Sequence, residues 1–144
     1  MTKPDAYGPI DVIVIEFPNG ADGANTATAL GDLVDSATVR LYDLMVVTTD
    51  AEGSCTEVEL SSDGPLSALA RFSGARSGLL TTDDVVDVAG VLEPGKAAAV
   101  LVYENAWAVP FVAAARGEDG HMVATSRLTA EEIMNALDAA ETAD

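Results

Sequence analysis

The sequence predicts an α+β fold: a ferredoxin-like split β-α-β sheet with additional α-β-α elements at its C-terminal end. Predicted strands and helices follow the order β-α-β-β-α-β before those last elements. Hydrophobic residues make up 49% of the 144 residues, enough to bury a sizeable core without disulfides. No stretch of the chain has the composition of a linker, so we expect one α+β domain over residues 1–144.

The first predicted strand covers residues 11–17, where an apolar run ends at the turn residues Pro18, Asn19 and Gly20. Apolar residues occupy both faces of this strand. That pattern is typical of a central strand covered on both sides. A short amphipathic helix should follow over residues 27–35.

Residues 39–49 and 55–60 are predicted to form a β-hairpin. The first segment is rich in valine, leucine, tyrosine and threonine, and residues 50–54 have the composition of a turn. In the second strand Glu57 and Glu59 alternate with apolar residues. One side of that strand should therefore face water, which places it nearer the sheet edge.

The next predicted elements are one or two helical turns over residues 66–72, a helix and a strand. Thr81 and Asp84 have the spacing of a capping box, and apolar residues then recur at helical intervals as far as Leu92. Residues 97–104 form another strand that is apolar on both faces. Two such strands need cover on both sides of the sheet.

The C-terminal part is predicted as helix, strand and helix. The first helix runs from Asn105 to about Arg116, and a short strand follows over residues 121–126. Thr129 and Glu132 match a Thr-x-x-Glu capping box that opens the last helix. The residues expected on its inward face are Ile133, Met134 and Leu137.

Charge narrows the range of partners. The chain has 24 acidic and 7 basic residues, a formal net charge of -17. Nucleic-acid and anionic-membrane binding both depend on basic side chains, so we expect neither. No apolar run is long enough to span a membrane, and none resembles a signal peptide. With the single cysteine Cys55, this predicts a cytoplasmic protein without membrane insertion.

One candidate ligand site stands out by residue type. Tyr103, Glu104, Asn105 and Trp107 lie together at a predicted strand-to-helix junction. Aromatic area beside a carboxylate and an amide can line a small pocket. In the structural alternative, Asn105 caps the helix and Trp107 covers the sheet edge or a subunit interface.

Glu16 and Glu104 end the two most apolar strands, where partial burial would suit acid-base catalysis. In a ferredoxin-like sheet these strands are antiparallel, which puts the two carboxylates at opposite ends. The alternative is a structural carboxylate that accepts hydrogen bonds from a turn or helix terminus. With His121 as the only histidine, we predict no catalytic residue, no metal site and no cofactor.

Four segments carry a resemblance to a known family over nearly the whole chain. They look like an uncharacterised family of short acidic actinobacterial proteins, and the segments are residues 8–18, 92–96, 102–107 and 126–132. From about Leu92 to Leu137 the chain is also similar to a wider bacterial family of unknown function that includes membrane-associated and stress-related proteins. Those relatives carry an apolar, glycine-rich hairpin where this chain has the polar residues 61–82, so the membrane association is not implied here.

The resemblance implies small α+β proteins, sometimes encoded near short oligomerisation-domain proteins, with no known cofactor or catalytic residue. Together with the pattern of the strands, it predicts a non-enzymatic cytoplasmic assembly or interaction protein, with stress response as one expected role. Since the helices of a split β-α-β unit cover one face, a homodimer or higher homo-oligomer should cover the other. The competing solution is a monomer in which the helices from Asn105 and Thr129 cross to that face. The alternatives are a small-ligand sensor at Tyr103–Trp107 and an enzyme that uses Glu16 or Glu104.

Overall fold

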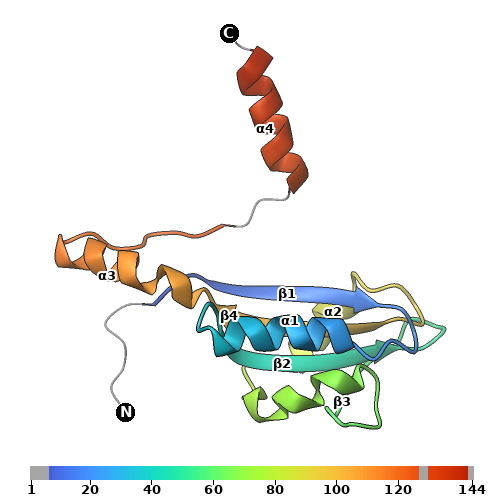
Figure 1. Cartoon of the computed structure of the whole chain (residues 1–144). Coiled ribbons are helices and arrows are strands. Elements are labelled where there is room, and N and C mark those ends of the chain that lie inside the picture. The colour runs from blue at the N-terminus through green and yellow to red at the C-terminus, as the bar shows by residue number, and fades with distance from the viewer. Residues whose placement is uncertain (1–6, 127–129, 143–144) are drawn as a thin grey trace.

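A computed structural model describes residues 7–126 and 130–142. Its centre is a four-stranded antiparallel sheet with the strand order β1-β4-β2-β3, as Figure 1 shows. The strands are β1 (Ile10–Phe17), β2 (Arg40–Thr49), β3 (Cys55–Val58) and β4 (Ala97–Glu104). The helical segments are α1 (Ala24–Asp35), η1 (Ser67–Ala75), α2 (Thr82–Ala89), η2 (Ala106–Ala108), α3 (Val109–Gly117) and α4 (Ala130–Thr142). The mixed α and β class predicted from the sequence is confirmed.

The hairpin and the order of the first elements agree with the prediction. β2 pairs with β3, and β4 lies between β1 and β2, antiparallel to both. Asp50 shapes the hairpin turn, because its Oδ1 accepts the N–H groups of Glu52 and Ser54. The predicted capping box opens α2, where the Thr81 N–H donates to Asp84 Oδ2 at 2.7 Å.

The expectation that helices cover only one face of the sheet is wrong. Leu30 of α1 and Leu69 of η1 pack on one face, over Leu101 of β4. On the opposite face, Val88 of α2 packs with the β4 residue Val100. α1 and α2 therefore lie on opposite sides of β4, in front of and behind the sheet in Figure 1. The centre of the sheet is covered within one chain, so the reason given for a dimer through a bare sheet face no longer holds.

The place of the first strand also differs from the prediction. β1 has the two-sided apolar pattern of a central strand, yet it lies at the edge of the sheet. β4 occupies the position between β1 and β2, and among the described residues no strand lies on the other side of β1.

The C-terminal elements agree with the prediction only in part. α3 forms with Pro110 in its first turn, as expected. Residues 121–126 form no strand: all six are exposed and none pairs with the sheet. A short alternating pattern makes a strand only where a neighbour supplies backbone partners. α4 is exposed over residues 130–141, so the predicted inward position of Ile133, Met134 and Leu137 is wrong. Thr129, the predicted cap of that helix, lies outside the described residues.

A buried aspartate holds the segment before α2 against the sheet. The side chain of Asp43 on β2 is fully buried, and its carboxylate accepts the N–H groups of Leu44, Ser77 and Leu80 at 2.7–2.9 Å. Arg76 completes the shell with a 2.7 Å ion pair to Asp43 Oδ2. Every lone pair direction of this carboxylate therefore meets a donor, as a buried charge requires.

This environment changes the titration of Asp43. Burial alone would raise its pKa, but the hydrogen bonds from Leu80, Ser77, Arg76 and Leu44 outweigh it and leave the pKa below its usual value. A lowered aspartate pKa stabilises the fold fully above the unfolded-state pKa of about 3.9. This contribution of Asp43 to the stability of the fold is lost as the pH falls through the lower pKa that the residue has in the folded state.

Asp43→Asn should therefore reduce the free energy of unfolding by about 3–5 kcal/mol at pH 7, because the amide leaves Arg76 and at least one buried N–H without their acceptor. Chemical denaturation measures this change, and Asp63→Asn, on an exposed loop, is the matched control. The difference between wild type and variant should shrink as the pH is lowered below about 4. A difference that is small at pH 7, or that grows in acid, would show that Asp43 does not hold this segment as a charged group.

Candidate functional site

In the part of the chain that the structure describes, no strand pairs with the outer edge of β1. The Asn105 N–H donates to the Pro9 carbonyl at 2.8 Å, which makes residues 9 and 105 a hydrogen-bonded pair in the antiparallel register of β1 and β4. Bonded and non-bonded pairs alternate along such a ladder. Ile13 and Ile15 therefore bond to β4, whereas Val12 and Val14 point their N–H and C=O groups away from the sheet.

The side chains of the same strand are exposed on both faces. Val12 and Val14 lie on the α2 face with 58% and 40% of their surface exposed, and Ile15 on the α1 face is 36% exposed. The eight residues of β1 include neither lysine nor proline. Edge strands are usually protected by such residues, by other charged side chains, by bulges or by their short length. The two carboxylates of β1, Asp11 and Glu16, accept hydrogen bonds within the fold, so β1 is an open edge.

An apolar groove, which we call the α1 groove, runs between β1 and α1. It has a volume of about 420 Å³. β1 contributes Ile13 and Ile15, α1 contributes Leu33, and Tyr103 and Trp107 also line the groove. None of the described side chains that line it is charged. The groove therefore suits a large apolar group.

A second groove, the α2 groove, lies on the other face of β1. Its volume is about 200 Å³, and its apolar lining includes Val12, Val14 and Val91. Two carboxylates from α2, Asp84 and Asp87, also line it. β1 thus separates two grooves of different size and charge.

Glu104 anchors the start of β1. Its carboxylate is fully buried and accepts the Gly8 N–H at 2.7 Å, the Tyr42 hydroxyl at 2.7 Å and an Arg40 N–H at 3.2 Å. Burial of the phenol and its hydrogen bond to Glu104 raise the pKa of Tyr42. These three donors come from the segment before β1 and from β2, so Glu104 joins the strands on both sides of β4.

Asn105 holds the same segment from the other side. Its side-chain Nδ2 donates to the Pro9 carbonyl and to Asp11 Oδ2, both at 2.9 Å. Trp107 Nε1 donates to Asn105 Oδ1 at 3.3 Å, and the Trp107 backbone N–H donates to Thr38. The ring of Trp107 is thereby positioned at the end of the α1 groove, with 59% of the residue exposed.

The structure divides the predicted ligand residues between two roles. Tyr103, Asn105 and Trp107 all line the α1 groove. Glu104 points to the opposite face of β4, where it makes the bonds described above. Alternating residues of a strand face opposite sides, so the four residues predicted at this junction do not form one pocket.

The two candidate acid-base residues lie far apart. Glu16 pairs in register with Ala98 and Glu104 with Ile10, so they are at opposite ends of the β1–β4 ladder, as predicted. Glu16 Oε1 accepts the Glu93 N–H at 2.8 Å. Neither carboxylate lines the α1 groove, the α2 groove or the two cavities beside η1. Both carboxylates therefore fit a structural role, as acceptors of hydrogen bonds within the fold, better than a role in catalysis.

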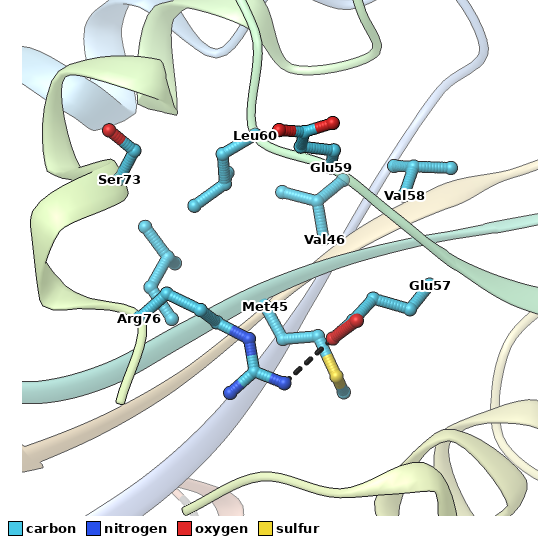
Figure 2. A pocket seen from close by; sticks show the side chains of 9 residues that line it. Met45, Val46, Glu57, Val58, Glu59, Leu60, Ser73 and Arg76 are labelled. Carbon is cyan, nitrogen blue, oxygen red and sulfur yellow. Dashed lines mark hydrogen bonds and ion pairs between the residues drawn. The ribbon is translucent and has the colours of Figure 1, made fainter. Parts of the chain in front are cut away.

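The opposite edge of the sheet differs from β1. β3 has four residues, and its Glu57 is paired with Arg76 at 2.7 Å. Figure 2 shows this pair at a cavity of about 330 Å³ between β3 and η1. The Arg76 guanidinium also donates to Asp43 and to the Leu80 carbonyl, so its charge is already paired with groups of the same chain. A short, charged strand of this kind is a protected edge.

Sequence reasoning missed the residues that give the site its shape. Leu33, Asp84 and Asp87 were assigned to helices, but nothing in their spacing predicts that α1 and α2 flank β1 on opposite faces. The available signal is β1 itself, whose apolar residues on both faces predict a central strand.

The chain belongs to a family of unknown function, DUF6325, whose profile matches residues 6–143. This match confirms the predicted kinship with a family of unknown function and brings no activity with it. No curated protein and no solved structure matches the chain. Within the described ranges, no helix is long and apolar enough to cross a membrane. The same residues hold no group of three or more potential metal ligands.

Gly8→Ala should destabilise the start of β1. A Cβ at this position would lie 2.0 Å from the Asn105 carbonyl oxygen, so the segment must move and give up its bond to buried Glu104. We expect a loss of about 2–3 kcal/mol in the free energy of unfolding, the range for a hydrogen bond to a buried charged group. Gly74→Ala is the control, since its Cβ meets nothing within 4 Å. Equal stabilities of the two variants in urea denaturation would rule out this anchor.

Amide hydrogen exchange tests the open edge. Ile13 and Ile15 should exchange slowly, because their N–H groups bond to β4. Val12 and Val14 should exchange orders of magnitude faster, although they lie in the same strand. NMR resolves the four amides individually. Uniformly slow exchange along β1 would mean that its outer edge is already paired.

Proposed function

We propose that the protein is a non-enzymatic interaction module that binds an extended segment of another protein by strand addition at β1. The observation that supports this most is the contrast between the sequence of β1 and its place. The strand has the pattern of one buried on both faces, yet it lies at an edge with unpaired backbone groups. An added strand would give β1 a neighbour on its outer side, as expected for a strand with apolar residues on both faces.

Strand addition also uses both grooves. The backbone groups of Val12 and Val14 would pair with the incoming chain, and its side chains would point alternately to the α1 and α2 faces. Backbone pairing supplies affinity in this mode of recognition, and pockets for alternate side chains supply specificity. The α1 and α2 grooves are placed where such side chains would lie.

A second copy of the chain is an alternative occupant. Two β1 strands in antiparallel pairing about Ile13 would set Val12 of each opposite Val14 of the other, with no carboxylate facing another. This homodimer keeps the oligomer expected from the sequence but moves its interface from a sheet face to an edge. On the α2 face a second copy offers only the small side chains of Val12 and Val14. On the α1 face it sets Asp11 opposite Ile15, beside an uncharged groove, so we favour a different strand.

The small-ligand alternative also has support from one observation. Three of the four residues predicted for such a site, Tyr103, Asn105 and Trp107, line the α1 groove, whose 420 Å³ lies in the range of small-molecule pockets. In strand addition at β1, the same groove would receive an apolar side chain of the added strand.

Val14→Pro separates strand addition from other kinds of binding. Proline removes an N–H that faces solvent and is tolerated at the edge of a sheet, so the fold should survive. A displayed library of linear peptides panned against the wild type should yield ligands that the Val14→Pro variant no longer binds. Val14→Thr keeps the N–H and a β-branched side chain, and should retain them. A library without ligands, or ligands that bind all three proteins equally, would contradict the proposal.

A further inference from the structure

The chemistry of the two grooves differs enough to specify the partner strand. The α1 groove is the larger, and its polar lining consists of neutral groups such as Thr26, Thr38 and Asn105. A charged side chain there would lose its hydration without gaining a counterion. The residues of a partner that face α1 should therefore be large and apolar.

The α2 groove has an apolar lining and an acidic wall. Val12, Val14 and Val91 offer surface to a hydrocarbon stem, and Asp87, exposed on α2, offers a carboxylate beyond it. Asp84 adds a second carboxylate, held in place by its bond to the Thr81 N–H. Lysine and arginine combine a long apolar stem with a cationic end. The stem would lie on the valines of the groove, and the cationic end would reach the carboxylates beyond them.

The overall charge acts in the same direction. A net charge of -17 attracts a cationic segment and repels an acidic one, and this increases the rate of encounter with basic partners. The local arrangement then sets the register, because only alternate residues of an added strand face α2.

We infer that the partner of β1 is a strand in which lysine or arginine alternates with large apolar residues. The basic side chains of this strand lie over Val12 and Val14 and reach toward Asp84 and Asp87. Its apolar side chains occupy the α1 groove. The inference rests on the proposed strand addition and names its ligand class. It selects a basic, amphipathic segment of a different protein over a second copy, whose β1 would place Val12, Val14 and Glu16 on the α2 face.

Three labelled peptides of equal length test it against the full chain at physiological salt. The first alternates lysine with phenylalanine and leucine between glycines. The second has the same composition with its lysines grouped together, which keeps the charge and removes the alternation. The third replaces every lysine of the first by threonine, which keeps the alternation and the β propensity. Fluorescence anisotropy gives the Kd of each.

The first peptide should bind at least tenfold more tightly than the other two and should slow exchange of the Val12 and Val14 amides. Asp87→Asn should weaken it about two- to fivefold, the range of one exposed ion pair, whereas Asp83→Asn, on the same helix but outside the groove lining, should change it less than twofold. Val14→Pro should abolish binding.

The remaining outcomes separate the two claims. If the threonine peptide binds as tightly as the lysine peptide and remains sensitive to Val14→Pro, strand addition holds and the preference for cations is wrong. If the grouped peptide binds equally well, the attraction is unspecific charge and the inference fails. If no peptide protects Val12 and Val14, the proposed function fails as well. A protein that is dimeric in light scattering and becomes monomeric on Val14→Pro would identify a second copy as the occupant and overturn the inference.

Discussion

The pairing of β1 with β4 is the interaction on which the rest of the structure depends. β4 pairs along its whole length with β1 on one side and with β2 on the other. Both clusters of core residues, one under α1 and η1 and one under α2, are built on the two faces of β4. Since β1 has no second neighbour among the strands that the structure describes, its position depends on this ladder and on the bonds at its start.

Buried polar groups fix the ends of that arrangement. Glu104 and Asn105, the last residue of β4 and the one after it, bind the segment before β1 through Gly8 and Pro9. Asp43 performs a similar task on β2, where it holds the segment before α2. In the described part of the chain, every buried polar side-chain atom has a hydrogen-bond partner. Such fully satisfied networks favour one arrangement of the chain over alternatives.

Local sequence signals predicted the elements well where a residue acts on its own neighbours. The turn at Asp50 and the capping box of Thr81 and Asp84 depend on interactions within a few residues. The alternation of Glu57 and Glu59 with apolar residues indicated the edge position of their strand. The predicted strand at residues 121–126 failed, because strand formation requires a partner that local pattern does not reveal.

The site could be predicted only in part for the same reason. Aromatic residues at the end of β4 indicated a pocket, and Tyr103 and Trp107 do line one. The apolar residues on both faces of β1 were visible as well. A strand buried by its own chain and an edge strand that binds another protein both have this pattern. Only the order of strands in the sheet distinguishes them, and that order follows from contacts between distant segments.

The addition of a further strand to β1 can be observed directly by NMR on the protein with the alternating lysine peptide bound. In an antiparallel addition, the α-proton of Ile13 points outward, toward the α-proton of the peptide residue opposite it. The account predicts a cross-strand contact between these two protons, absent in the Val14→Pro variant. Contacts of the bound peptide confined to β3, α3 or α4 would contradict it.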